Sequence, residues 1–504
     1  MKRTIGTLLA ALLATSFFAS LALAEDAPLA LTLKESIRRG VENNLEVRTE
    51  LYNPAGYEAE INRNRGIYDL LFSAATNYND NETLSAAVLP GSDSELQTFH
   101  LDSSLSQLFS SGATAAIGFD NVYTRNVTGA PTLLPDYWQS QLSLRVRQPL
   151  LKDFGRENTE VNINVSRLGK AAALDHFDLR LESVVAQVRN EYFRLFSLRE
   201  EREVQKVSLE LARKILAETK ARVEAGVLPA MEILNAEFAA TTREKELIDA
   251  ERAVSDQMDV LRLLLQITAV GEIETIDLPE RDPISVDEEQ ALQRSLSRPE
   301  IREQLRNLEI AELQNRVFAN RTRPDLALTG SASFSGLDRS YPDNLAEAGS
   351  FATPSWGIGL IFSYPLGNNV ADNDYRKSRL KSEQLMLQIR QLEEVTAKEV
   401  KAAIRSISSG YKQLDVADRG RAYAEERLKA FIRKNEVGLA TGKDVMDVEN
   451  DLVAAKKNQI LAAVNYTNAI TGFWLVTGEL LEREGITVND AAADADALYK
   501  GTAR

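Results

Sequence analysis

The sequence contains no cysteine and only two histidines, His100 and His176, among its 504 residues. Common metal centres and nucleophilic active sites draw on thiolates and clustered imidazoles, so this composition leaves little from which to build either. Disulfides and an N-terminal lipid anchor also require cysteine and are excluded. Each histidine lies in a stretch where a solvated or packed imidazole is ordinary. We therefore expect no enzyme activity, no bound metal and no cofactor.

Long apolar runs are equally scarce. One spans residues 5–23, after Lys2 and Arg3, and Ala22-Leu23-Ala24 places small residues where signal peptidase requires them. The pattern predicts a cleavable signal peptide over residues 1–24, with an uncleaved anchor helix as the alternative. No later run reaches the roughly 18 residues of a membrane-spanning helix. We expect a chain that is exported across the inner membrane and whose mature form carries no transmembrane helix.

The chain also lacks a basic surplus. It has 59 basic and 74 acidic residues, for a formal net charge of −15. Because phosphate contacts need basic patches, nucleic acid is excluded as a partner.

The sequence does contain a long repeat. Three segments recur in order at offsets of 256, 216 and 212 residues: 69–78 as 325–334, 142–150 as 358–366, and 222–226 as 434–438. This period is far longer than the roughly 20 to 50 residues of a solenoid unit. The pattern predicts two homologous halves of one structural unit, residues 25–283 and 284–482, followed by a flexible C-terminal tail over residues 483–504.

The fall in offset from 256 to 216 places 40 extra residues in the first half, ahead of Pro149. Two strand-like segments, 99–105 and 115–120, flank a turn at Ser110-Ser111-Gly112, so the insert is predicted to form a hairpin. Either this hairpin adds two strands to the sheet of the first half, or it folds outside that sheet.

Strand patterns alternate apolar and polar residues. Trp356, Ile358 and Leu360 share one face of their segment, and the other face is small or polar apart from Ile361. Apolar outward and polar inward faces are typical of outer-membrane barrel strands, with a half-buried soluble sheet as the alternative. The predicted strands cover residues 69–80, 97–124 and 138–149 in the first half, and 325–336 and 354–365 in the second.

Each half continues into a very long helix after a proline at the strand-to-helix junction, Pro149 or Pro365. Apolar residues step by three and four through residues 174–195 and 385–414, as in a coiled-coil seam. A helix over residues 161–223 would be about 90 Å long. The predicted fold class is thus α+β, with four or six transmembrane β-strands per chain joined to long periplasmic coiled-coil hairpins.

Glycines mark the predicted hairpin tips. Gly226 and Gly438 suit a left-handed helix cap. Pro229 is predicted at the first position of the helix that follows, and Thr441 and Asp444 are predicted to form a capping box. Each half therefore makes an antiparallel helical hairpin.

The ordered set of landmarks resembles the TolC-like family of outer-membrane efflux and secretion channels, the outer membrane efflux proteins. Residues 31–37 and 43–48 are similar to the family's first helix, and residues 298–302 to its counterpart in the second half. Gln148-Pro149-Leu150 and the two glycine tips fit the same pattern. The resemblance covers about residues 31–481.

This resemblance implies a homotrimer in outer-membrane lipid, with four strands per chain in one shared twelve-stranded barrel and twelve helices in a periplasmic tunnel. Four strands are too few to close a barrel alone, since known barrels begin at about eight, so oligomerisation is also expected physically. The implied partners are a periplasmic adaptor (membrane fusion protein) and an inner-membrane transporter, docking at the tips around Gly226, Pro229 and Gly438.

The family's gate lies at the tips. The resemblance places its constricting acids at Asp444 and Asp447, with Glu232 as the matching acid of the first hairpin. Alternatively these carboxylates only stabilise helix macrodipoles, by roughly 0.3 to 1 kcal/mol each. The family's latch tyrosine and arginine are replaced here by Asn435 and Ala440, and Lys443 is the candidate substitute cation.

Four further charged residues have simpler expectations. Glu237 and Glu449 are predicted on solvated helix faces. Arg145 and Arg147 are predicted either in a barrel lumen or at its periplasmic rim.

Two functions follow from these patterns. The first is a passive trimeric export duct, for efflux or type I secretion, that docks on an inner-membrane pump and its adaptor. The second is a periplasmic coiled-coil scaffold or adaptor without a pore. The sequence does not specify the cargo, because the pump would select it.

Overall fold

The computed structural model describes residues 28–83, 94–128, 133–268 and 271–486. The predicted signal peptide lies outside these ranges, as does the predicted tail from residue 487 onward. Residues 483–486, however, are folded. Arg483 ends α13 (Leu480–Arg483), and Glu484 forms an ion pair with the buried Arg189. The predicted start of the tail at residue 483 is therefore wrong, because a buried guanidinium needs its countercharge in place.

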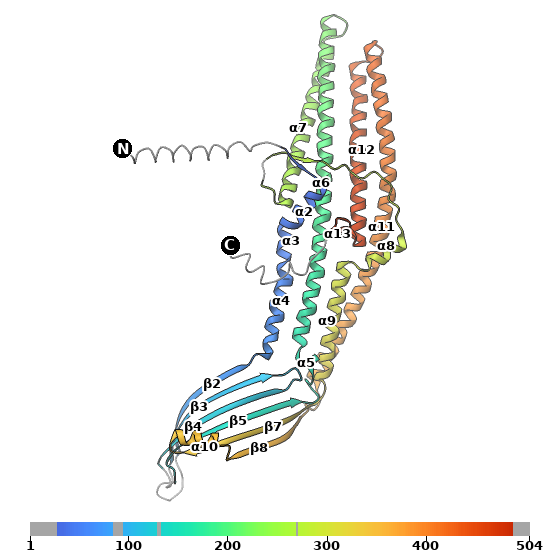
Figure 1. The fold of residues 1–504 in the computed structure, drawn as a ribbon. Coiled ribbons are helices and arrows are strands. Elements are labelled where there is room, and N and C mark those ends of the chain that lie inside the picture. Colours follow the sequence, from blue (N-terminus) through green and yellow to red (C-terminus); the bar gives the residue numbers. More distant parts are fainter. Residues whose placement is uncertain (1–27, 84–93, 129–132, 269–270, 487–504) are drawn as a thin grey trace, which may run out of the picture. The chain divides into compact units, whose positions relative to one another are not determined.

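Two compact units make up the chain, and the long helices α6 (Val161–Glu224) and α11 (Asn369–Glu436) contribute to both (Figure 1). Residues 53–173 and 303–389 form a sheet unit. The described residues of 28–52, 174–302 and 390–486 form a hairpin unit. At about 1.5 Å per residue, the 64 residues of α6 extend about 96 Å, as predicted.

The sheet unit contains one antiparallel sheet in the order β2-β3-β4-β5-β7-β8. Its strands are β2 (Leu71–Thr83), β3 (Ser94–Leu108), β4 (Thr114–Thr128), β5 (Asp136–Pro149), β7 (Asp325–Asp338) and β8 (Pro354–Ser363). The 40-residue insert supplies strands inside this sheet, β3 and β4, so the alternative of a hairpin outside it is wrong. The same unit contains most of α4 (Tyr52–Arg65), the 3-10 turn η1 (Gly66–Tyr68), α5 (Arg156–Thr159) and most of α9 (Pro299–Arg321).

The two faces of this sheet differ in chemistry because successive side chains of a strand point to opposite sides. On one side, Leu144 lies opposite Ile117 and Ala332. One residue further, Arg145 lies opposite Ala116 and Ser331. We call these sides the apolar face and the polar face. On β8 the apolar face carries Trp356, Ile358, Leu360 and Phe362, each at least 66% exposed in the single chain.

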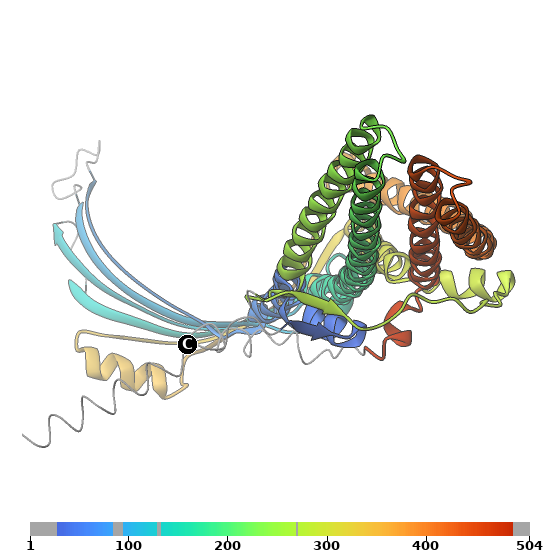
Figure 2. The same cartoon turned by 90° about the horizontal axis from the view of Figure 1, so that it is seen from above.

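A short helix, α10 (Tyr341–Gly349), lies between β7 and β8 in the chain. It packs on β5 and β7, against the convex side of the curved sheet (Figure 2). That side is the apolar face, because a side chain added at Gly336 of β7, opposite Ser140, would collide with the α10 backbone.

The hairpin unit contains two antiparallel helical hairpins. The first joins α6 to α7 (Met231–Leu265), and the second joins α11 to α12 (Gly442–Thr477). Shorter elements flank them: β1 (Leu29–Leu31) paired in parallel with β6 (Ile273–Thr275), and the helices α2 (Leu33–Asn43), α3 (Leu45–Glu50), α8 (Glu288–Ser295) and α13.

The predicted seams are the core of the hairpin unit. Val184, Val188 and Tyr192 are at most 1% exposed in the first hairpin, and Val400, Ile407 and Leu414 at most 4% in the second. Across the described residues, none of the helices combines the length and apolar character needed to cross a bilayer.

Candidate functional site: the hairpin tips and the two-faced sheet

Both hairpin tips are built by the same turn. Gly226 and Gly438 adopt φ of 73° and 76°, a region that only glycine occupies without strain. After Gly226, the Val227 amide donates to the carbonyl of Arg222, and after Gly438 the Leu439 amide donates to that of Lys434. These six-to-one bonds are the Schellman closure of a helix. The repeat in the sequence is thus a repeat in backbone geometry.

The helices that leave the tips begin differently. Thr441 caps α12: its hydroxyl accepts from the Asp444 amide, and the Asp444 carboxylate accepts from the Thr441 amide at 2.8 Å. This is the predicted capping box. The prediction for Pro229 is wrong, because α7 begins at Met231 with Ala230 as its N-cap. The Pro229 carbonyl instead accepts from the Glu232 amide, so residues 229–232 form a turn that leads into α7.

A groove of about 1000 Å³ runs between the two tips, and it brings the three predicted gate acids together. Glu232 enters it from α7, and Asp444 and Asp447 from α12. Pro229 and Gly438 also line this groove. Hydrogen bonds from the Thr441 side chain and backbone hold the pKa of Asp444 below its usual value, so this carboxylate is charged at neutral pH.

Basic groups share the same groove. Arg222, Arg243 and Lys443 line it alongside the acids. At the latch positions, the Asn435 amide donates to the Ala440 carbonyl at 2.9 Å, which closes the second tip on itself. Arg222 of the first hairpin donates to the Asn435 carbonyl at 3.4 Å. This contact between the tips uses a backbone carbonyl as its acceptor, so the sequence pattern alone does not predict it.

The prediction that Glu449 lies on a solvated helix face is wrong. Glu449 is 3% exposed, and its carboxylate pairs with the Arg243 guanidinium of α7 at 2.9 Å. Arg243 is also buried and pairs with Glu246 at 2.6 Å. One signal was present in the sequence: Glu449 lies four residues after Val445 and three before Leu452, on the seam itself. Glu237 behaves as predicted, half-exposed beside Lys220.

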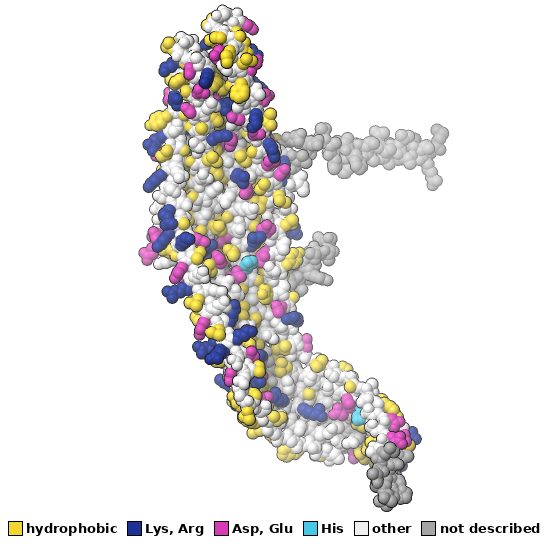
Figure 3. All heavy atoms as spheres, turned by 180° about the vertical axis from the view of Figure 1, so that it is seen from behind, with side chains coloured by type: hydrophobic (Ala, Val, Ile, Leu, Met, Phe, Trp, Pro, Cys, Tyr) yellow, Lys and Arg dark blue, Asp and Glu magenta, His cyan; other side chains and the backbone are white. Residues whose placement is uncertain are grey.

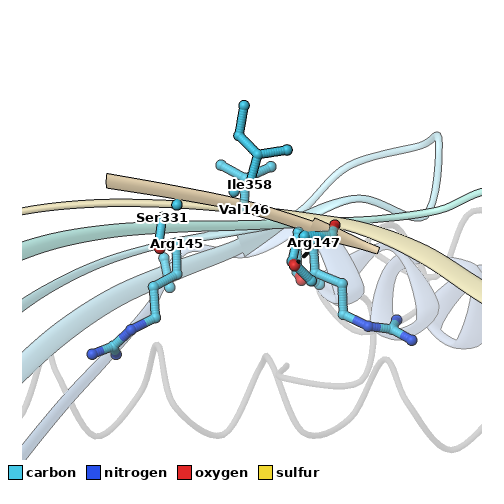
Figure 4. Close-up of a pocket in the computed structure, with 11 residues that line it drawn as sticks. Arg145, Val146, Arg147, Ser331 and Ile358 are labelled. Carbon is cyan, nitrogen blue, oxygen red and sulfur yellow. Dashed lines mark hydrogen bonds between the residues drawn. The ribbon is translucent and has the colours of Figure 1, made fainter. Parts of the chain in front are cut away.

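In the sheet unit, Arg145 and Arg147 project from the polar face, opposite in direction to Val146 and Ile358 (Figure 4). Arg145 lies 3.8 Å from Asp120, and Arg147 lies 3.0 Å from Asp325. Small side chains such as Ala116 and Ser331 surround them, which leaves this face open. Pro149 ends β5, and Pro365 lies between β8 and α11.

A family model described as outer membrane efflux protein matches residues 94–265 and 289–479, well over half of the chain. The chain belongs to the outer membrane efflux protein family. Membership confirms the predicted resemblance and the coarse function and location, an efflux channel of the outer membrane. It also argues against the pore-free periplasmic scaffold.

Solved structures of other channels share the fold of this outer membrane efflux protein. The outer-membrane channel OprN matches with a TM-score of 0.66 at 15% identity, over 89% of this chain and 90% of OprN. CmeC of Campylobacter jejuni matches with 0.65 at 15% identity, over 91% and 90%. VceC of Vibrio cholerae matches with 0.63 at 14% identity, over 88% and 96%. A search of curated protein sequences found no significant match.

Proposed function

We propose that three copies of this chain form a passive channel-tunnel that exports cargo across the outer membrane. The two-faced sheet carries the proposal: its apolar face suits lipid and its polar face suits an aqueous lumen. In the described part of the chain, no strand pairs with the outer edge of β2 or of β8. Each unpaired backbone group in hydrocarbon costs several kcal/mol, so neighbouring copies must close the barrel.

Three sheets of six strands would give eighteen strands, rather than the twelve expected from four strands per chain. Barrel diameter grows roughly linearly with strand number, and barrels of about 16 to 18 strands enclose an aqueous channel. The polar face, with Arg145 and Arg147, would line this lumen. The insert therefore widens the proposed exit by about half without changing the number of long helices per chain.

The hairpin tips are the proposed docking surface for a periplasmic adaptor and an inner-membrane transporter. Apolar side chains on the tips are at least 66% exposed in the single chain: Val227, Met231, Leu234, Phe238, Val437 and Leu439. Figure 3 displays apolar side chains at the surface there. Exposed apolar clusters of this kind favour contact with other chains. We also propose that residues 1–24 are cleaved as a signal peptide and that the chain is not lipidated, because it contains no cysteine.

The gate is proposed at Asp444 and Asp447, with Glu232 facing them across the groove. A three-fold axis would gather six aspartate carboxylates, and like charges about 4 Å apart interact by roughly 1 to 4 kcal/mol depending on the effective dielectric. Such a ring binds cations. Acidification weakens this binding as the carboxylates take up protons.

Single-channel recording in planar bilayers tests the duct and its gate together. Replacing Asp444 and Asp447 by Asn removes charge while an amide oxygen still caps α12. We expect higher conductance, weaker cation preference and loss of block by divalent cations. Glu237→Gln, an acid paired with Lys220 outside the groove lining, is the matched control and should leave selectivity unchanged. A wild-type protein that forms no pores contradicts the duct, and a double variant that selects like the wild type contradicts the gate.

A further inference from the structure

Two neighbouring polar residues on the apolar face of the sheet are buried. Asn121 of β4 and Ser140 of β5 lie opposite each other there and are 2% and 0% exposed. Polar side chains that face hydrocarbon without a hydrogen-bond partner cost several kcal/mol each. At this place the apolar face does not continue to lipid, because α10 covers it.

A buried hydrogen-bond network fastens α10 to these strands. Asn344 of α10 is fully buried; its amide donates to the Ser140 hydroxyl at 2.5 Å and its carbonyl oxygen accepts from the Ser140 backbone amide at 3.1 Å. The Ser140 hydroxyl donates to Asn121 at 2.7 Å. Gly336 of β7 allows the close approach, because a Cβ there would lie 2.1 Å from the backbone carbonyl oxygen of Asn344. The sheet is thus shaped to hold this helix.

Aromatic rings surround the same position. The Trp138 ring contacts the rings of Tyr341, the first residue of α10, and Tyr123 in tilted geometry, with centroids 4.7 and 5.0 Å away. After α10, Phe351 packs edge-on against Phe334 at 4.6 Å, yet it is 57% exposed and has φ of 57°. A bulky residue in the left-handed region is strained, so the surroundings must favour this placement. Tryptophan and tyrosine are typical of the boundary between lipid tails and headgroups.

The outer surface of α10 is mixed. Pro342, Asp343, Ala346 and Glu347 are exposed, and Leu345 is half-buried. Carboxylates are unfavourable in hydrocarbon, but apolar and acidic groups together suit an interfacial helix. A second copy of the chain is the poorer occupant, because α10 packs on β5 and β7, whereas copies would meet at the edges β2 and β8.

We propose that α10 is an interfacial helix that lies in the headgroup layer of the outer leaflet and sets how deeply the barrel sits in the membrane. The inference rests on the proposed function. β7 enters the sheet after α9 and ends at Asp338, so α10 lies at the strand ends opposite the helical connections. In the proposed barrel, β7 begins on the periplasmic side, so its end at Asp338 and the adjoining α10 lie at the outer surface of the membrane.

The absence of native cysteine makes a direct test possible, since one introduced cysteine carries a unique fluorescent label. Three variants are labelled and reconstituted in phosphatidylethanolamine and phosphatidylglycerol vesicles: Ala346→Cys on α10, Ile358→Cys on the apolar face, and Ser331→Cys on the polar face. Nitroxide lipids, spin-labelled at the headgroup or deep in the acyl chain, then serve as quenchers.

We expect the Ala346 label to be quenched about twofold more by headgroup nitroxide than by deep nitroxide, and the Ile358 label to show the reverse. The Ser331 label should respond only to aqueous iodide. An Ala346 label quenched by iodide alone overturns the inference. An Ile358 label that no lipid quenches instead overturns the barrel, so the two failures are distinguishable. Adding Asn344→Ala should lower quenching at residue 346 but not at 358; unchanged quenching at 346 would contradict the anchoring role of Asn344.

Discussion

At the scale of single residues, the buried pair of Arg243 and Glu449 joins the two helical hairpins through charges that are almost wholly removed from water. Taking charges out of water is costly, and the pair offsets that cost only while both partners are present. Such a pair therefore favours one arrangement of α7 against α12. Arg243 also lines the groove that holds the proposed gate acids.

The first residue-scale prediction concerns this pair. Glu449→Gln leaves Arg243 with Glu246 alone and should destabilise the hairpin unit by about 1 to 3 kcal/mol, less than a fully orphaned charge. Thermal unfolding followed by circular dichroism in detergent measures the change. Replacing both Arg243 and Glu449 by leucine should recover most of the loss. A double replacement as unstable as Glu449→Gln would mean that shape, not charge, holds the hairpins together.

Glu182 of α6 supports a prediction with a pH signature. It is 3% exposed, one carboxylate oxygen has no hydrogen-bond partner in the structure, and burial raises its pKa to about 7. An acid whose pKa is raised on folding destabilises the fold as pH rises from the unfolded value, near 4.5, to about 7. Below that window the residue is protonated in both states and has no such effect.

Glu182→Gln should therefore stabilise the protein at pH 8, by on the order of 1 to 3 kcal/mol, and change little at pH 4. The measurement is the difference in Tm between variant and wild type across this range. Glu237→Gln, at a half-exposed position, serves as the control and should show no such trend. A Tm difference that is the same at both pH values would show that Glu182 does not titrate on folding.

At the scale of elements, the insert determines the width of the sheet. β3 and β4 lie between β2 and β5 and continue both faces in register from Leu96 to Leu108, with one register shift between Glu95 and Leu96. Antiparallel order is preserved when two strands are added, because each strand reverses the chain once. The insert therefore enlarges the sheet without changing where its first and last strands meet the helices.

If β3 is part of a lipid-facing wall, its two sides must respond differently to charge. Leu105→Arg places a cation on the apolar face and should cost up to about 2 to 4 kcal/mol, which lowers the yield of assembled trimer. Ser106→Arg, one residue away on the polar face, should be tolerated. Trimer yield on non-denaturing gels is the measurement. Equal yields from both variants would place β3 outside the membrane.

At the scale of the whole molecule, the part of the chain that the structure describes has an exposed apolar face on β8 and no strand paired with the outer edge of β2 or β8. We expect lipid and neighbouring copies to cover them. The mature protein should fractionate with the outer membrane and run as a trimer in mild detergent. Crosslinking between cysteines placed on β2 and β8 should join neighbouring chains, whereas cysteines on β4 and β8 should not crosslink. Recovery as a soluble periplasmic monomer would contradict the channel.

The sequence by itself determined the repeat, the strands, the long helices and their glycine tips, because these depend on local periodicity and on backbone conformations that few residues adopt. It also placed Asp444 in its capping box, a contact within one turn. The tertiary structure decided what depends on residues distant in the chain. Glu449 is a charged residue that is nevertheless buried, because Arg243 of the other hairpin, 206 residues away in the chain, pairs with it. The insert forms two strands inside the sheet because β3 pairs with β2 and β4 pairs with β5. The role of Asn344 depended on a partner 204 residues away, which no local pattern specifies.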